Sequence, residues 1–79
     1  MSVIKEDIIN CMKEMELNID FDNLLSDKNL NDQGIDSLDM MNFFFNLEER
    51  FSVKISEESI ESGKWETIND IVTNINSLK

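Results

Sequence analysis

Residues 32–41 read Asp-Gln-Gly-Ile-Asp-Ser-Leu-Asp-Met-Met, and they decide the fold because they join a turn to the start of a strongly apolar helix. Gly34 suits the turn, and Asp36 can cap the helix by accepting hydrogen bonds from N–H groups of its first turn. With that cap, the Ser37 hydroxyl would be free at the helix N-terminus, where unpaired N–H donors and the helix dipole stabilise an anion. Ser37 acting as a plain helix cap is the alternative. The segment predicts a helix over residues 37–50.

The helix predicted over residues 37–50 has two apolar sides, which follow from placing its residues at 100° intervals. The side that we expect to be buried comprises Met40, Phe43, Phe44, Leu47 and Phe51. The opposite side comprises Leu38, Met41 and Phe45, and it is flanked by Asp39, Asn42, Glu48 and Glu49. A small bundle does not easily cover both sides of one helix. The second side is therefore either covered by a long loop or exposed for partner binding.

Three further helices are predicted from apolar spacing and capping residues. Apolar residues three and four apart predict an amphipathic helix over about residues 3–16, with Cys11 on its buried side. Residues 56–62 are expected to form a short helix capped by Ser56. Thr67 is expected to cap the last helix. The predicted fold class is all-α, a small bundle of three main helices plus one short helix.

The segments between the helices are expected to contribute to the core. Residues 17–35 form a long connection that carries too many apolar side chains to be disordered, and we expect these side chains to pack against the bundle. Residues 51–55 are expected to be an extended linker whose apolar side chains also enter the core. The chain has neither repeats nor an interdomain linker, so residues 1–79 are expected to form a single domain.

Composition excludes several kinds of partner. The net charge of −10 makes nucleic acids and acidic membrane surfaces unfavourable, whereas basic patches on other proteins are complementary, although acidity also serves solubility alone. The longest uninterrupted apolar run is residues 43–45, which is too short to insert into a membrane, and a basic leader segment is missing. We therefore expect a cytoplasmic monomer.

An enzyme or a metal-binding module is disfavoured by the residues that the chain lacks. There is no histidine to activate Ser37, and the lone cysteine has no base and no partner for a disulfide. Residues 27–31 begin like a calcium-binding loop, but Asp32 occupies the position of the turn glycine and Leu38 that of the bidentate glutamate. We expect neither catalytic residues nor metal ligands.

The order and spacing of several motifs resemble the acyl carrier protein family. Gly34 to Asp39, then Met40-Met41 and Leu47 to Phe51, resemble the second helix of these proteins, and Thr67 to Ile71 resemble the start of their last helix. The resemblance extends over about residues 3–78. It implies that a phosphopantetheinyl transferase attaches 4′-phosphopantetheine from coenzyme A to Ser37. It also implies that the chain catalyses nothing and presents thioesters to other enzymes.

The same resemblance implies a surface for partner enzymes and leaves the cargo open. The residues that it assigns to partner binding are Asp36, Leu38, Asp39, Met41, Phe45, Glu48 and Glu49. The acids would meet basic patches on loading ligases and synthases of fatty-acid, polyketide or related biosynthesis, and the apolar residues would fill shallow pockets. The sequence Gly63-Lys64-Trp65 is closer to D-alanyl or peptidyl carriers. We expect a discrete carrier, and a protein-interaction domain without a prosthetic group is the alternative.

Overall fold

The fold is a small helical bundle. It is described by a computed structural model over residues 2–78, in which no strand is found. The helices are α1 (Lys5–Glu14), α2 (Ser37–Phe51), α3 (Glu57–Glu61) and α4 (Ile68–Leu78). Two single-turn 3₁₀ helices, η1 (Phe21–Asn23) and η2 (Asn31–Gln33), lie in the connection between α1 and α2. Three long helices and one short helix confirm the predicted fold class.

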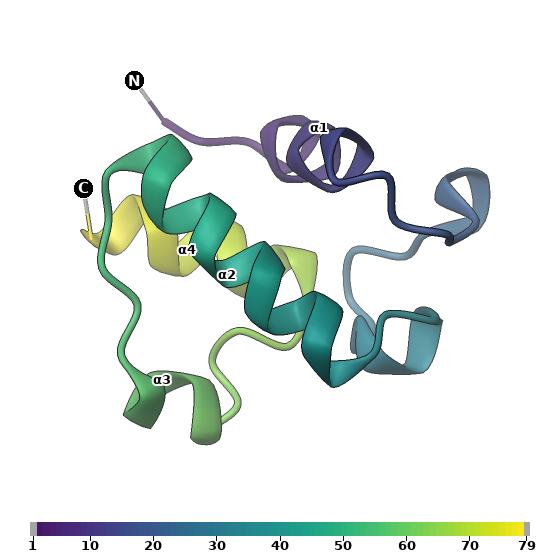
Figure 1. Cartoon of the computed structure of the whole chain (residues 1–79). Coiled ribbons are helices and arrows are strands. Elements are labelled where there is room, and N and C mark those ends of the chain that lie inside the picture. The colour runs from purple at the N-terminus through teal and green to yellow at the C-terminus, as the bar shows by residue number, and fades with distance from the viewer. Residues whose placement is uncertain (1, 79) are drawn as a thin grey trace.

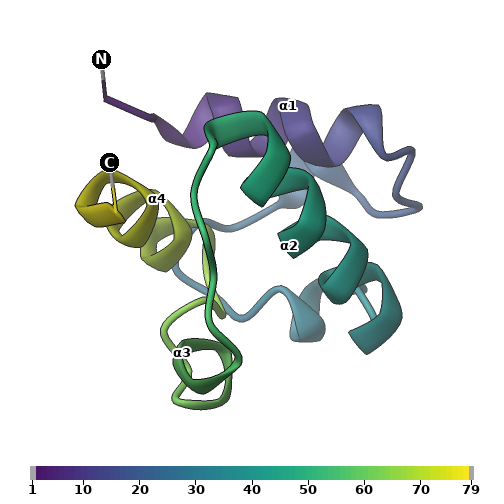
Figure 2. The ribbon, with the colours of Figure 1, turned by 60° about the vertical axis from the view of Figure 1, so that its left-hand side comes forward.

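Helix α1 packs against both α4 and α2, and α3 lies apart from the three long helices. Figure 1 shows α2 crossing in front of α4, with α1 along the side of the bundle, and the turned view in Figure 2 shows α3 at the far end of the linker from α2. The two chain ends lie on the same side of the molecule. There, the Asn76 side chain accepts a hydrogen bond from the Val3 N–H (2.8 Å) and donates one to the Val3 carbonyl (2.9 Å).

The core is apolar, and among residues 2–78 no polar or charged side chain is buried. Five apolar residues were predicted for the inner side of α2. Four of them, Met40, Phe43, Phe44 and Leu47, are buried, and the fifth, Phe51, is half-buried. Cys11 on α1 is buried, as predicted, and Trp65 before α4 is buried as well. Phe44 links two parts of this core, because its ring meets the Trp65 indole edge to face at a centroid distance of 6.2 Å.

The first two helices differ slightly in length from the prediction. Helix α1 begins at Lys5, because the Asp7 carboxylate accepts a hydrogen bond from the Ile4 N–H (3.0 Å) and closes the N-terminus there. The chain leaves α1 before residue 16, where Glu16 has a positive φ of 58°. Helix α2 continues to Phe51, one residue beyond the prediction, and ends where Ser52 adopts the left-handed conformation with φ 53°.

The long connection between α1 and α2 packs against the bundle, as predicted. Leu30 and Ile35 are fully buried, and most of the other apolar residues of the connection pack against the core. The Leu30 N–H donates to the Glu66 carbonyl (2.8 Å), which ties the connection to the segment before α4. A second tie joins the Asn69 N–H to the Ser26 carbonyl (3.0 Å). These bonds position the chain that leads into α2.

Candidate functional site

The turn before α2 sets the direction in which the helix starts. Gly34 has a φ of 103°, a left-handed conformation that residues with a Cβ rarely adopt. The next residue, Ile35, is 1% exposed, so the turn is anchored in the core. Asp36 then takes an extended conformation, and its carboxylate accepts a hydrogen bond from the Asp39 N–H at 2.8 Å. Asp36 is therefore the residue that caps α2.

Ser37 is the first residue of α2 and is exposed. Its hydroxyl makes no hydrogen bond with any other residue in the range 2–78, since the cap position is filled by Asp36. Two roles were considered for Ser37, a helix cap and a free hydroxyl at the helix N-terminus. The structure excludes the first, because Asp36 is the cap. A free hydroxyl at a helix N-terminus is open to a modifying enzyme, and an anion attached to it would lie next to N–H groups without intrahelical partners.

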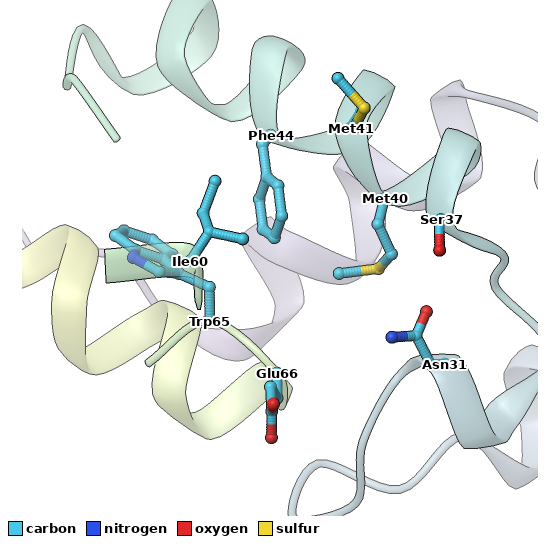
Figure 3. Close-up of a pocket in the computed structure, with 8 residues that line it drawn as sticks. All are labelled: Asn31, Ser37, Met40, Met41, Phe44, Ile60, Trp65 and Glu66. Atoms are coloured by element: carbon cyan, nitrogen blue, oxygen red, sulfur yellow. The ribbon is translucent and has the colours of Figure 1, made fainter. Parts of the chain in front are cut away.

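A pocket of about 260 Å³ opens beside Ser37, between α2 and the segment from α3 to α4. Its lining residues are Asn31, Ser37, Met40, Met41, Phe44, Ile60, Trp65 and Glu66. Figure 3 shows Met40 and Phe44 extending from α2 toward the side of Ile60 and Trp65, with the Asn31 amide directed toward Ser37. The pocket thus has apolar walls and carries polar groups near the serine.

The Trp65 wall of this pocket is held from behind by a hydrogen bond. The indole Nε1–H donates to the Ser59 hydroxyl at 2.9 Å, so the ring is oriented as well as buried. Ser59 in turn donates to the Ser56 carbonyl (2.8 Å) within the capped start of α3. The wall opposite α2 is therefore a fixed surface rather than a loose loop.

The second apolar side of α2 is exposed. The exposed fractions of Leu38, Met41 and Phe45 are 68%, 57% and 59%, so the long connection does not cover these side chains. A smaller cavity of about 110 Å³ lies further along α2, and Met41 and Phe45 line it together with residues of α3 and the linker. Of the two alternatives considered for this side of α2, covered by the long connection or exposed, the structure shows the exposed one.

The four acids predicted for partner binding differ in their surroundings. Asp36 and Glu49 are exposed, and Asp39 is half-buried in the first turn of α2. Glu48 is also half-buried, and its Oε2 atom accepts a hydrogen bond from the Ile55 N–H at 2.8 Å. Glu48 therefore connects α2 to the linker before α3, a role that its position on the helix did not predict.

Other candidates for chemistry do not form a site. Burial raises the pKa of the Cys11 thiol, although the nearby Arg50 charge opposes this rise, so the thiol is protonated and inert at neutral pH. Within residues 2–78, no three Cys, Asp or Glu side chains are placed to hold a metal ion, and the calcium-like start at residues 27–31 is no exception. No helix in that range is both long and apolar enough to cross a membrane.

Three pocket residues were not predicted from the sequence: Asn31, Ile60 and Glu66. They come from η2, from α3 and from the end of the segment leading to α4, and only the tertiary fold brings them to Ser37. The length of the connection that contains Asn31 was the one available indication, since long loops in small domains often serve function.

Comparison with known proteins agrees with this geometry. A family model described as "Phosphopantetheine attachment site" matches residues 7–75, a range that contains the whole of α2 with Asp36 and Ser37. The chain is also similar to an acyl carrier protein of Kineococcus radiotolerans, with 34% identity over 79 residues that cover 95% of each chain.

Proposed function

This chain belongs to the acyl carrier protein family, and we propose that Ser37 is the residue that bears its phosphopantetheine group. Proteins of this family are carriers rather than catalysts, and they interact with phosphopantetheinyl transferases and biosynthetic enzymes. When bound, phosphopantetheine supplies a terminal thiol that holds an acyl or aminoacyl group as a thioester. The observation that carries the proposal is the free, exposed Ser37 hydroxyl beside a cap supplied by Asp36.

The start of α2 suits a phosphodiester on Ser37. The N–H groups of Ser37 and Leu38 belong to the first turn and have no intrahelical acceptor, and the helix dipole favours negative charge there. Asp36 directs its carboxylate to the Asp39 N–H, which leaves those two donors available. The Asp36 and Asp39 carboxylates repel the phosphodiester. Solvent screens this repulsion, because Asp36 is exposed and Asp39 is only half-buried.

The pocket beside Ser37 is the place that we propose for the cargo end of the thioester. Its walls are formed by Met40, Phe44, Ile60 and Trp65, which suit an apolar acyl chain. Asn31 and Glu66 add polar groups at its edge, which suit the amides of the arm or a polar acyl group. Fatty-acyl, polyketide, aminoacyl and D-alanyl thioesters all remain candidates. A D-alanyl or peptidyl carrier of a specialised pathway is the second candidate function.

We propose that the exposed side of α2 binds the partner enzymes. Leu38, Met41 and Phe45 supply the apolar contact, and Asp36, Asp39 and Glu49 surround it with negative charge. The net charge of −10 favours enzymes with basic patches around their active-site entrance. Glu48 contributes charge at the same place but is held by the Ile55 N–H. The carrier is proposed to act in the cytoplasm as a monomer, with residues 1–79 as a single domain.

The mass of the intact protein tests the proposal. The unmodified protein is incubated with coenzyme A and a broad-specificity phosphopantetheinyl transferase, together with the Ser37→Ala variant and a Ser62→Ala control at another exposed serine. We expect the parent and the control to gain one phosphopantetheine group and Ser37→Ala to gain none. Equal gain by Ser37→Ala, or no gain by the folded parent with several transferases, would refute the assignment of Ser37.

A further inference from the structure

A separate cavity of about 210 Å³ lies between the linker before α3 and the C-terminal half of α4. Its lining includes Lys54, Ser56, Lys64, Trp65, Asn74 and Ser77. It shares Trp65 with the pocket beside Ser37 but contains neither Ser37 nor any residue of α2. The carrier function proposed above makes no use of it.

The charge of this cavity is opposite to that of the rest of the chain. The sequence has seventeen acidic and seven basic residues, yet two lysines and no acid line the cavity. The two cavities beside α2 contain one or two glutamates each and no basic residue. A lining with two lysines and no acid favours an anionic ligand over a cationic one at this place.

The walls of the cavity are held in place by hydrogen bonds. The Asn74 amide Nδ2 donates to the Lys64 carbonyl (2.5 Å) and to the Asp70 carbonyl (3.0 Å), which fixes the Lys64 backbone against α4. The Trp65 indole is fixed by its bond to Ser59. The backbone that presents the Lys64 side chain is therefore ordered before any ligand binds, which lowers the entropy cost of binding.

Three of the residues that line the cavity carry side-chain donors without a partner among residues 2–78. The Lys54 and Lys64 ammonium groups form neither an ion pair nor a hydrogen bond with another residue between 2 and 78, and the same holds for the Ser77 hydroxyl. The Ser56 hydroxyl, in contrast, donates to the Ser59 hydroxyl at 3.0 Å. Two cationic donors and one hydroxyl around a cavity are the groups that bind an oxyanion through charge-assisted hydrogen bonds.

We propose that this cavity binds a small phosphate-type oxyanion, either inorganic phosphate or the head of a phosphate monoester. The affinity is expected to be on the order of millimolar, because both lysines are exposed and the net charge repels anions. At physiological ionic strength the repulsion by acids more than about 8 Å away is screened. The Glu66 carboxylate, which lies beside Gly63, opposes the two lysines at closer range and also lowers the affinity.

Titration with inorganic phosphate, followed by amide chemical shifts in NMR and by fluorescence of the single tryptophan, tests this proposal. Sodium chloride at matched ionic strength is the reference. We expect saturable shifts confined to residues around Lys54, Lys64 and Ser77. Lys54→Gln and Lys64→Gln are each expected to weaken binding roughly 2- to 5-fold, the range of exposed ion pairs, and the double variant to abolish saturation. Lys28→Gln, at an exposed lysine in the α1–α2 connection, should bind like the parent.

Two further ligands separate the sources of the phosphate group. Glycerol phosphate is expected to bind like inorganic phosphate, whereas vesicles containing phosphatidic acid are expected to produce no shift. Three results would each overturn the proposal. The first is chemical shifts that do not saturate, the second is a loss of binding in Lys28→Gln as large as in the Lys54 and Lys64 variants, and the third is binding to vesicles alone. The test is independent of Ser37, because Ser37→Ala should bind phosphate as the parent does.

Discussion

Replacing Glu48 with alanine is expected to lower the free energy of unfolding by about 1–2 kcal/mol. The Glu48 carboxylate accepts a hydrogen bond from the Ile55 N–H at 2.8 Å, and Ile55 is a buried residue of the linker between α2 and α3. A hydrogen bond to a charged group contributes about 1.5–3 kcal/mol. Glu48 is half-buried, so water partly replaces the lost acceptor. The higher helix propensity of alanine reduces the expected loss of stability by roughly a few tenths of a kcal/mol more.

Urea denaturation followed by the fluorescence of Trp65 and by far-ultraviolet circular dichroism measures this loss. Glu49→Ala is the matched control, because Glu49 is exposed on the same turn, and a change within about 0.5 kcal/mol is expected. Glu48→Gln keeps an oxygen acceptor without the charge and should lose roughly half as much as Glu48→Ala. If Glu48→Ala and Glu49→Ala were equally stable, the structural role assigned to Glu48 would be wrong.

Three further predictions concern the turn, the core and the buried thiol. Gly34→Ala is expected to destabilise the fold by about 1–2 kcal/mol in urea denaturation, because alanine disfavours the left-handed conformation of this residue. The added Cβ would not clash, since its nearest neighbouring atom, in Ile19, is 3.5 Å away, and an unchanged urea midpoint would contradict the prediction. Phe43→Ala is expected to cost about 3–5 kcal/mol and Phe45→Ala less than about 0.5 kcal/mol in the same assay, and similar losses would show that the two sides of α2 are misassigned. Cys11 should resist iodoacetamide in the native protein and react when the protein is unfolded. Because burial raises the pKa of the Cys11 thiol, the unfolded state loses the thiol proton at a lower pH than the folded state does. The free energy of unfolding should therefore fall as the pH rises above the ordinary thiol pKa, and it should fall less steeply in Cys11→Ala.

The parts of the fold that follow from local physics were predictable from the sequence. The cap at Asp36 depends on residues three apart in sequence, and the inner side of α2 follows from helical periodicity, so both were predicted and found. The short helix α3 was predicted for the same reason, because the Ser56 hydroxyl accepts a hydrogen bond from the Ser59 N–H, also three residues away.

The features that depend on distant contacts were not predictable. The Gln33 amide accepts a hydrogen bond from the Leu25 N–H (2.7 Å) and donates to the Leu25 and Lys28 carbonyls (2.9 and 3.0 Å), which folds the long connection into a compact loop. Nothing in the local pattern distinguishes Gln33 from any polar loop residue. Glu48 is a similar case, since its sequence position suggested a partner contact and only the packed linker reveals that its carboxylate accepts a hydrogen bond from the Ile55 N–H.

The candidate site divides in the same way. Ser37 and its helix start were predictable because they form one contiguous motif. The pocket next to it was not, because Asn31, Ile60 and Glu66 come from three separate segments. The sequence also left open whether the outer side of α2 is covered, since that depends on the path of the whole connection. The exposure of Met41 and Phe45 answers that question.

The central claim is that Ser37 carries the phosphopantetheine group, and fragmentation of the transferase-treated protein in a mass spectrometer tests it most directly. Fragments that begin at the N-terminus and end at Asp36 should have the unmodified mass, and those that end at Leu38 should carry the whole added group. Fragments that place the added mass at any other residue would contradict the claim.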